Sequence, residues 1–379
     1  VKTVPALVAA LFPEHPMAKE WADLFEKFIE LNTRYHTRPA VQAWNSRGGR
    51  WTENLGTYVW AFLRPLIRAE YMLREHFDGK NRLASPRLAE IADWAVNALS
   101  APYDGEDLEF YRDESGRIPN HFWGIVTKEL GPRRLHPPQG AHSARRMPPR
   151  TLWWMGKSLL NYRPLLAEAL MWASRQDDQD SEHPKDKPDP WKIMFTGPTN
   201  TGTNPHLRSS KYTGYGITLR AGVDTKAETS IHLVQLDEGP NYRWGIAGEG
   251  GCGVIYYYAG GKAYSHNGRE DVGDRPAHDT DFATNFGVWK DGRFRSIGRN
   301  VLKSPLMDLG PTQFVELLPR TGNNAYSWPE YQSRSVMMAG TDYFAIYDDV
   351  FNDAVAHRFS WATHKNEDFP YIHLIKGGM

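Results

Sequence analysis

In the first 175 residues, apolar side chains recur at every third or fourth position, which is the spacing of amphipathic helices. This spacing predicts four helices, over residues 17–33, 53–77, 86–99 and 151–174. In the first of them the apolar positions form one stripe: Trp21, Leu24, Phe25, Phe28 and Leu31. In the fourth, five side chains are expected to face inward: Leu152, Met155, Leu159, Leu165 and Leu166.

Prolines and small polar residues mark the helix ends. Ser85 is placed to cap the third predicted helix, and Pro86 suits its first helical position. Pro65 lies inside the second predicted helix, and we expect it to kink or split that helix because its ring removes a backbone donor.

After residue 190 the apolar positions alternate with a period of two. The alternation predicts short strands over residues 214–219, 230–236, 254–259, 335–338 and 344–349. A charged, proline-containing connector over 175–190 separates the two patterns and marks a domain boundary. The sequence therefore predicts an α+β chain of two domains, a helical domain over 1–190 and an antiparallel β-sandwich over 191–379.

Composition excludes several classes of protein. The 379 residues include 45 basic and 45 acidic side chains, so the basic surplus of a dedicated nucleic-acid binder is missing. No apolar run approaches the roughly 18–20 residues of a membrane-spanning helix. A single cysteine excludes a disulfide framework and a thiolate zinc cluster. The aromatic share of 13% is high, and rings in such number serve either as core or as platforms for ligands such as sugars.

The chain begins at Val1 without a charged and then apolar leader, and it stops at Met379 directly after an alternating stretch. We therefore expect a piece of a longer polypeptide, whose signal peptide has been cut away or was never included in this chain.

The stretch 51–58 is the first candidate for chemistry. Thr52 or Asn54 is suited to cap the helix that follows, and Asn54 and Tyr58 then lie one turn apart on the same face. One interpretation is a simple cap with a packed tyrosine. The other is an amide and a phenol presented together at a helix start, where backbone N–H groups favour anions.

The long polar loop over 103–150 is the second candidate. It carries Tyr111, His121, His142 and several arginines, Arg145 among them. Loops with this composition are either solvated surface or functional. In the functional interpretation the arginines neutralise an acidic ligand, and a histidine or tyrosine transfers protons.

In the strand half, Arg243 stands between Tyr242 and Trp244, an arrangement that suits a carboxylated sugar as well as plain surface display. The glycine-rich run 248–253 lacks the Lys-Ser/Thr of a phosphate loop and opens a strand, which excludes nucleotide binding there. Cys252 in that run is interpreted as a small buried residue.

Acidic and histidine side chains follow in the same half, and they either gather round one ion or form a solvated loop, which is the favoured reading. These residues are Asp237, His266, Asp271, Asp274, His278 and Asp279.

The chain has a helical first half with an asparagine at a helix start, then a loop bearing tyrosine and histidine, and then antiparallel strands. This order of parts resembles that of the heparinase II/III-like polysaccharide lyases. The runs 250–253 and 264–268 are also similar to bacterial members of that group. The resemblance implies an incomplete (α/α) toroid followed by a β-sandwich, truncated here at the C-terminus. It also implies cleavage of uronic-acid polysaccharides by β-elimination in a cleft between the two halves.

The resemblance also implies roles for particular residues. Asn54 matches the residue that neutralises the uronate carboxylate, Tyr111 matches the base and acid, and His142 assists, with His121 in reserve. The remaining substrate-binding candidates are Tyr58, His121, Arg145, Arg243, Trp244 and His266. No cofactor is required, although some members hold a structural Zn or Ca in the sandwich.

The chain departs from the family pattern in two places. The stretch 241–244 stands where a His-x-His-x-Asp sequence is frequent, so Arg243 takes over the contact with a carboxylate or sulfate. The surroundings of Tyr111 lack the Asp-Gly-Ser pattern, which keeps Tyr58 and His142 as alternative bases.

Two other classes stay open. A glycoside hydrolase needs two carboxylates flanking the bond, for which Glu53, Asp113 and Glu114 are available. A non-catalytic carbohydrate-binding protein would use the tryptophans and Arg243. The expected partner in the leading reading is an anionic polysaccharide, with no nucleic acid and no membrane span, and the sequence does not determine the oligomeric state.

Overall fold

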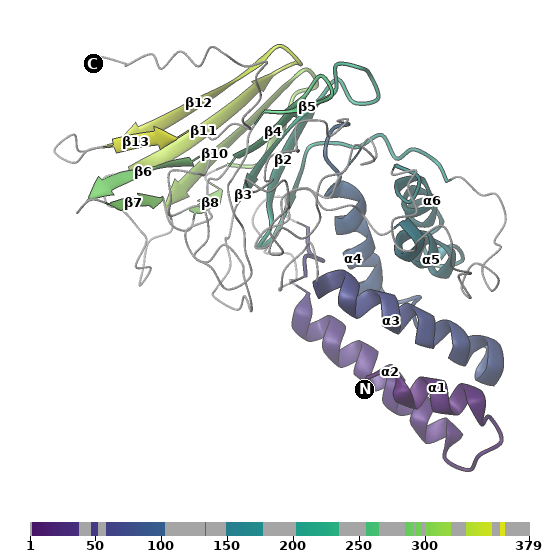
Figure 1. The fold of residues 1–379 in the computed structure, drawn as a ribbon. Coiled ribbons are helices and arrows are strands. Elements are labelled where there is room, and N and C mark those ends of the chain that lie inside the picture. Colours follow the sequence, from purple (N-terminus) through teal and green to yellow (C-terminus); the bar gives the residue numbers. More distant parts are fainter. Residues whose placement is uncertain are drawn as a thin grey trace, which may run out of the picture.

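The structure is a computed structural model, and it describes residues 2–37, 47–51, 58–102, 133, 149–176, 202–234, 255–264, 285–290, 293–296, 300–302, 304–319, 331–350 and 357–360. Figure 1 shows the helices gathered at one end of the molecule and the sheets at the other, with α4 beside the strands β2 and β3.

Six α-helices and one π-helical turn lie in the described part of the first half. They are α1 (Val4–Leu11), α2 (Ala18–His36), α3 (Tyr58–Leu73), the π-helical turn Arg74–Asp78, α4 (Pro86–Asn97), α5 (Pro149–Leu159) and α6 (Pro164–Ala173). The helical character predicted for this half is confirmed, and α1 is an addition that the spacing did not reveal.

The helix ends show which local predictions hold. The hydroxyl of Ser85 accepts a hydrogen bond from the backbone N–H of Leu88 at 3.3 Å, so the predicted cap of α4 is confirmed. The helix α3 continues through Pro65, so the alternative that Pro65 splits it is wrong.

The prediction of one helix over 151–174 is wrong. The helix α5 ends at Leu159, and α6 begins at Pro164, which takes the first helical position. Because of the turn between them, Leu165 is 86% exposed instead of facing inward. On α2, Leu24 and Leu31 are also exposed, and the buried face is carried instead by Phe25 and Ile29 together with small residues.

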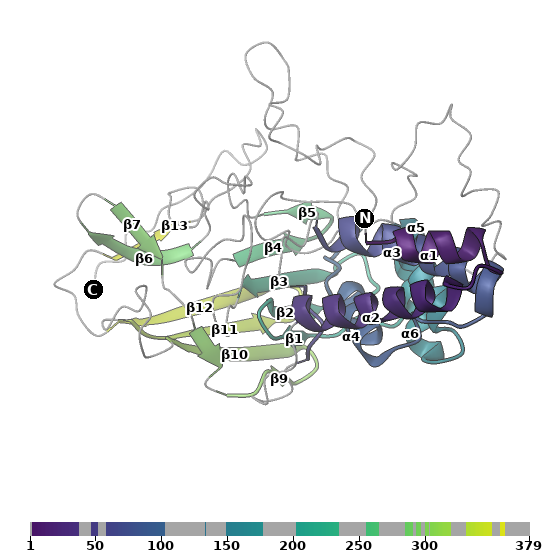
Figure 2. The same ribbon diagram turned by 90° about the horizontal axis from the view of Figure 1, so that it is seen from below.

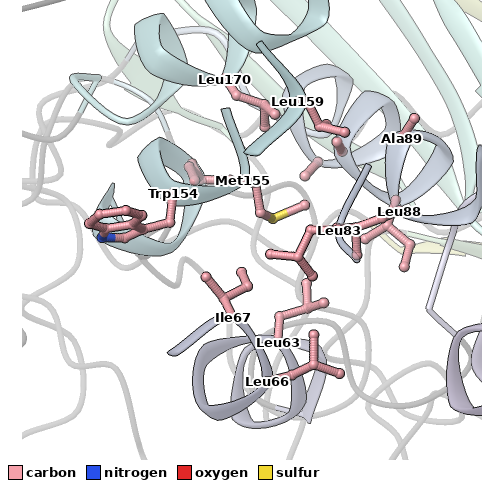
Figure 3. Close-up of a cluster of buried hydrophobic side chains, with 14 of the residues drawn as sticks. Leu63, Leu66, Ile67, Leu83, Leu88, Ala89, Trp154, Met155, Leu159 and Leu170 are labelled. Carbon is pink, nitrogen blue, oxygen red and sulfur yellow. The ribbon is translucent and has the colours of Figure 1, made fainter. Parts of the chain in front are cut away.

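Side chains from several helices form one hydrophobic core. Figure 3 shows Met155 of α5 and Leu63 of α3 pointing toward Leu83, which lies in the connection before α4. Tyr212 and Tyr215, from the start of the strand half, are buried in this same core. The helical half and the first strands are therefore packed together and not merely tethered.

The strands form three antiparallel sheets. The first has the order β1-β2-β3-β4-β5, with β1 (Ser210–Tyr212), β2 (Gly216–Ala221), β3 (Thr229–Val234), β4 (Ile255–Ala259) and β5 (Lys262–Ala263). The second has the order β12-β11-β10-β8, with β8 (Asn300–Leu302), β9 (Met307–Asp308) paired to β10 (Thr312–Pro319), β11 (Tyr331–Ala339) and β12 (Tyr343–Val350). The third has the order β13-β6-β7, with β6 (Asn285–Lys290), β7 (Arg293–Ser296) and β13 (His357–Ser360).

The first and second sheets share a hydrophobic core. Ile217 and Leu219 of β2 belong to the same buried cluster as Val315 of β10 and Val336 of β11. In Figure 2 the strands of these two sheets lie along one another, and β6, β7 and β13 lie at the end remote from the helices. Alternate residues of each strand supply this core, as the period of two predicted.

The α+β class, with helices first and antiparallel strands second, is confirmed. Closure of the helices into an incomplete toroid, the full sandwich and the division at 190/191 stay predictions, and that boundary lies outside the described residues. In the part of the chain that the structure describes, no helix combines the length and apolarity needed to cross a membrane.

Candidate functional site

The residues predicted to carry the chemistry lie almost entirely outside the described ranges. This holds for Asn54, Tyr111, His142, His121, Arg145, Arg243, Trp244 and His266. Tyr58 is the first residue of α3, and its side chain is not described. These assignments therefore stay predictions. The structure does describe the places where the chain enters several of these segments.

The places where the chain enters these segments lie around one face of the first sheet. We name it the junction face, and it consists of Thr218 and Arg220 of β2 with Ser230 and His232 of β3. Every residue of β2 is buried, because its apolar side chains face the second sheet while the junction face is covered by the end of α4. Ser230 accepts a hydrogen bond from the backbone N–H of Ala101 at 3.0 Å. The alternate polar positions of these strands are thus interior, where every polar group requires a partner.

Arg220 joins the junction face to the C-terminal end of α4. Its guanidinium donates to the backbone oxygen of Asn97 at 3.0 Å and also to that of Leu99. Burial lowers the pKa of Arg220 to about 10, while the carboxylate of Glu228 opposes that change. The backbone carbonyls that end α4 carry the negative end of the helix dipole and stabilise the buried cation.

A second arginine, Arg133, reaches the same place from the long loop. It forms a two-pronged ion pair with Glu228, in which Nη1 donates to Oε1 and Nη2 to Oε2, both at 2.7 Å. Nη1 also donates to the backbone oxygen of Ser100 at 3.0 Å, and the guanidinium lies 5.5 Å from the ring centre of Trp172 on α6. One side chain therefore contacts the end of α4, α6 and the turn before β3.

His232 is fully buried on this face. Its Nδ1 lies 2.9 Å from the hydroxyl of Thr218, and its ring lies 4.5 Å from that of Tyr215. Burial lowers the pKa of His232 to about 3. The imidazole is consequently neutral at any ordinary pH and does not serve as a cationic partner for a substrate.

Tyr212 and Asp93 link β1 to α4. The phenol of Tyr212 donates to Oδ2 of Asp93 at 2.7 Å, and Nη1 of Arg47 lies 3.4 Å from the same oxygen. Burial raises the pKa of Tyr212 well above its usual value, and burial does the same for Tyr215. Both phenols stay protonated, so neither is suited to act as a base.

The segment 47–51 leads directly to the predicted Asn54, and it is held at several points. The backbone of Arg47 bridges to that of Tyr212, with Arg47 N–H donating to the oxygen of Lys211 at 2.9 Å. Gly49 has a φ of +102°, and a Cβ there would meet a backbone oxygen of α4 at 2.1 Å, so only glycine allows this approach. Trp51 is buried with its ring 4.7 Å from that of Phe62.

A cavity of about 780 Å³ opens beside the junction, between α4, α6 and the segment 47–48. Its lining mixes apolar side chains with charges of both signs: Arg47, Gly48, Pro86, Ala89, Glu90, Asp93, Val96, Asn97, Tyr162, Arg163, Pro164, Leu165, Leu166, Ala169 and Pro205. The exposed Leu165, which the periodicity placed inward, belongs to this lining.

The described junction residues supply fixed charges and hydrogen bonds rather than proton transfer. Arg47 pairs with the carboxylate of Asp93, and Arg133 and Arg220 lie beside that of Glu228. Among the described residues no group of three or more His, Cys, Asp or Glu side chains is arranged to hold a metal ion. The residues predicted for an ion lie outside the described ranges.

Sequence reasoning missed this network. Arg220 and His232 stand at alternate positions of short strands, where a polar side chain reads as solvent-facing. A carboxylate such as Glu228 in a turn carries no signal that an arginine from a distant loop will reach it. No pattern within the sequence alone identified these residues.

Similarity to known proteins is found at the level of the fold. No family model matches the chain, and the search of curated proteins finds no match. Solved structures of the heparinase III class do share its fold.

Heparan sulfate lyase HepC from Pedobacter heparinus aligns with a TM-score of 0.55 at 12% identity, covering 92% of this chain and 44% of HepC. A heparinase III gene product aligns with a TM-score of 0.54 at 12% identity, again covering 92% of this chain and 44% of that one. The chain thus spans less than half the length of the structures it resembles, and the likeness at this identity is one of fold.

Proposed function

We propose that this chain is part of a polysaccharide lyase that cleaves a uronic-acid-containing anionic polysaccharide by β-elimination. The observation that carries the proposal is the likeness of fold to heparan sulfate lyase over 92% of the chain. In this proposal the helices belong to an incomplete (α/α) toroid, the sheets belong to a β-sandwich, and the substrate lies where the two meet. A secreted or periplasmic location is part of the same proposal.

The reaction removes the proton on the carbon next to the uronate carboxylate and breaks the glycosidic bond on the neighbouring carbon. Negative charge builds on the carboxylate as the proton leaves, so the site has to neutralise that group and to place a base at the proton. We assign the first task to Asn54, with Arg243 as a cationic contact, and the second to Tyr111 assisted by His142. The leaving oxygen takes a proton, and the product carries a carbon–carbon double bond.

Two features of the junction support these assignments. The segment 47–51, which ends three residues before Asn54 in the sequence, is held against β1 and α4. Arg133, in the segment that carries Tyr111 and His142, is held at the same junction by its ion pair with Glu228. Tyr212, Tyr215 and His232 are unsuited to proton transfer, and the candidates for the base stay Tyr111, Tyr58 and His142.

The test is a panel of heparan sulfate, chondroitin, hyaluronan, alginate and ulvan, followed by ultraviolet absorbance of the conjugated product. Hydrolysis leaves no such double bond, and a binding protein makes no product. We expect Asn54→Ala and Tyr111→Phe each to reduce the rate about 10²–10⁴-fold, because each removes a group that acts in proton transfer or charge neutralisation.

Tyr35→Phe is the matched control. Tyr35 is exposed on α2, so the same loss of a hydroxyl there should leave the rate unchanged. Absence of ultraviolet product from every polysaccharide of the panel would contradict the lyase proposal. Full activity of Tyr111→Phe would instead move the base to Tyr58 or His142.

A further inference from the structure

Three aromatic rings surround a lysine where α3 and α5 lie side by side (Figure 2). Nζ of Lys157 lies 5.0 Å from the ring centre of Trp154, 5.7 Å from that of Trp153 and 5.9 Å from that of Tyr71. We name Lys157 and these three rings the lysine–aromatic cluster. Lys157, Trp153 and Tyr71 are each partly exposed, so the cluster is accessible from solvent.

The spacing of residues along both helices produces this cluster. Trp153 and Lys157 are four positions apart on α5 and therefore share one face of it. Tyr71 lies in the last turn of α3. The ring centre of Trp154 lies 5.0 Å from that of Trp153 and 5.1 Å from that of Tyr71, and both pairs meet edge to face. The three rings therefore hold one another in fixed positions before any ligand binds.

The ammonium of Lys157 lacks acceptors for its N–H groups. Among the residues that the structure describes, no carboxylate lies within ion-pair distance of its Nζ, and no group accepts a hydrogen bond from it. The ring faces attract its charge, but they are not ordinary hydrogen-bond acceptors. A partly buried ammonium in this state is stabilised by an anionic ligand that supplies the acceptors.

The other charges near the cluster leave this role to Lys157. The guanidinium of Arg74 lies 5.2 Å from the ring centre of Tyr71, but its Nε is also 3.6 Å from the carboxylate of Glu75. Burial raises the pKa of Tyr71, so its phenol stays neutral and adds no negative charge.

The ligand that fits these groups is a sugar with an acidic substituent. One face of a pyranose ring carries C–H groups that pack on aromatic rings, while a carboxylate or sulfate accepts hydrogen bonds from an ammonium. We infer that the lysine–aromatic cluster is a subsite for an acidic sugar unit, with Lys157 on the acidic group and Trp153 and Tyr71 along the sugar ring. The inference rests on the proposed function for the kind of polysaccharide to which that unit belongs.

The subsite is separate from the alternative base Tyr58. Tyr58 begins α3, and the length of helix between it and Tyr71 is roughly 20 Å. One sugar unit does not span this distance, so the subsite holds a part of the polysaccharide several units away from the bond that is cleaved. A contact of this kind is equally strong in the ground state and the transition state, so it lowers KM and leaves kcat unchanged.

The experiment compares Lys157→Gln with Lys2→Gln. Lys2 also lies over a ring, with its Nζ 5.5 Å from the ring centre of Phe28, but it is exposed and lies outside the cluster. Both substitutions remove one positive charge and one contact between a lysine and an aromatic ring. Lys157→Arg is the second probe, because an arginine keeps the charge, donates hydrogen bonds and stacks on rings.

Affinity electrophoresis in the cold measures binding without relying on turnover. The migration of the folded protein is compared in native gels that contain heparan sulfate, hyaluronan or neutral dextran. Heparan sulfate carries sulfates and carboxylates and hyaluronan carries carboxylates alone, so these two gels distinguish the acidic groups. The Kd for the polysaccharide that retards the wild type should rise about 10-fold in Lys157→Gln, because a charge-assisted hydrogen bond is lost. Lys2→Gln and Lys157→Arg should stay close to the wild-type Kd, and dextran should retard none of these proteins.

An equal Kd for Lys157→Gln and Lys2→Gln would overturn the subsite. Retardation of the wild type by neither acidic polysaccharide, or by dextran as strongly as by the acidic ones, would overturn it as well. The lyase proposal fails separately: retardation that depends on Lys157, without any ultraviolet product, would support the subsite and refute the elimination. Where the wild type cleaves, Lys157→Gln should raise KM for the polysaccharide and keep the wild-type kcat.

Discussion

The buried His232 allows a prediction about stability against pH whose size follows from the structure. Burial holds the pKa of this imidazole at about 3 in the folded protein, against 6.5 for an ordinary histidine. As the pH falls below 6.5 the unfolded chain takes up a proton at this residue, and the folded protein does not. Folding free energy is therefore lost between about pH 6.5 and about pH 3.

The magnitude is set by linkage. Each pH unit inside this window changes the free energy of unfolding by about 1.4 kcal/mol. Between about pH 7.5 and about pH 5 the wild-type protein should lose about 2 kcal/mol on account of His232 alone. Other titrating groups add their own changes, so the effect has to be isolated by a variant.

His232→Asn provides that variant. The amide nitrogen of asparagine takes the position of Nδ1 and keeps a partner for the hydroxyl of Thr218, which lies 2.9 Å from Nδ1 in the wild type. Because asparagine does not titrate, the variant should lose about 2 kcal/mol less than the wild type over the same pH interval. Urea unfolding followed by tryptophan fluorescence at both pH values gives the four free energies that this comparison needs.

His76→Asn is the matched control, since His76 is exposed and folding does not remove its ring from water. Its pH response should equal that of the wild type. An equal pH response of His232→Asn and the wild type would refute the reasoning, because it would mean that the buried imidazole is protonated without cost.

Three further predictions concern single contacts, each measured as a change in the free energy of unfolding. Gly216→Ala should cost more than Gly260→Ala. Both glycines have a positive φ, where a Cβ costs about 1–2 kcal/mol, but only at Gly216 would the new Cβ also lie 2.3 Å from a backbone oxygen of β3, whereas Gly260 has open space around it. Ser85→Ala should cost about 1 kcal/mol through loss of the cap of α4. Tyr212→Phe should cost about 1–3 kcal/mol, because it removes the hydrogen bond to Asp93. Equal costs for the two glycine variants, or no cost for either of the others, would contradict the corresponding contact.

The local elements were predictable where one physical cause dominates. Ser85 followed by Pro86 carries its own start signal, and α4 begins there. The strands β2, β3 and β4 follow from the alternation of apolar side chains, because one face of each meets the second sheet. Such patterns show that one face of an element is buried against an apolar surface. They therefore predict the element but not which other element it packs against.

The failures have an equally physical origin. The apolar run over 151–174 reads as one helix, but Pro164 starts a new helix and the turn before it exposes Leu165. The polar residues Arg220 and His232 read as solvent-facing, but the end of α4 covers them. The periodicity shows whether a side chain is polar or apolar, but not whether another element of the fold covers it.

The candidate catalytic residues were reached from residue types and family resemblance, and Asn54, Tyr111 and His142 stay predictions. The buried ion pair between Arg133 and Glu228 was not foreseen, since the two residues are far apart in the sequence. A pairing of this kind has no local signature, because both residue types are common in exposed loops.

The sequence by itself determined the order of helices and strands, the absence of a basic surplus and the residue types available for acid–base chemistry. These properties depend on neighbours along the chain and on composition. The tertiary structure decided which polar groups are buried, which charges meet and which phenols and imidazoles are held out of proton transfer. Those properties depend on desolvation and on contacts between distant residues, and folding alone brings these about.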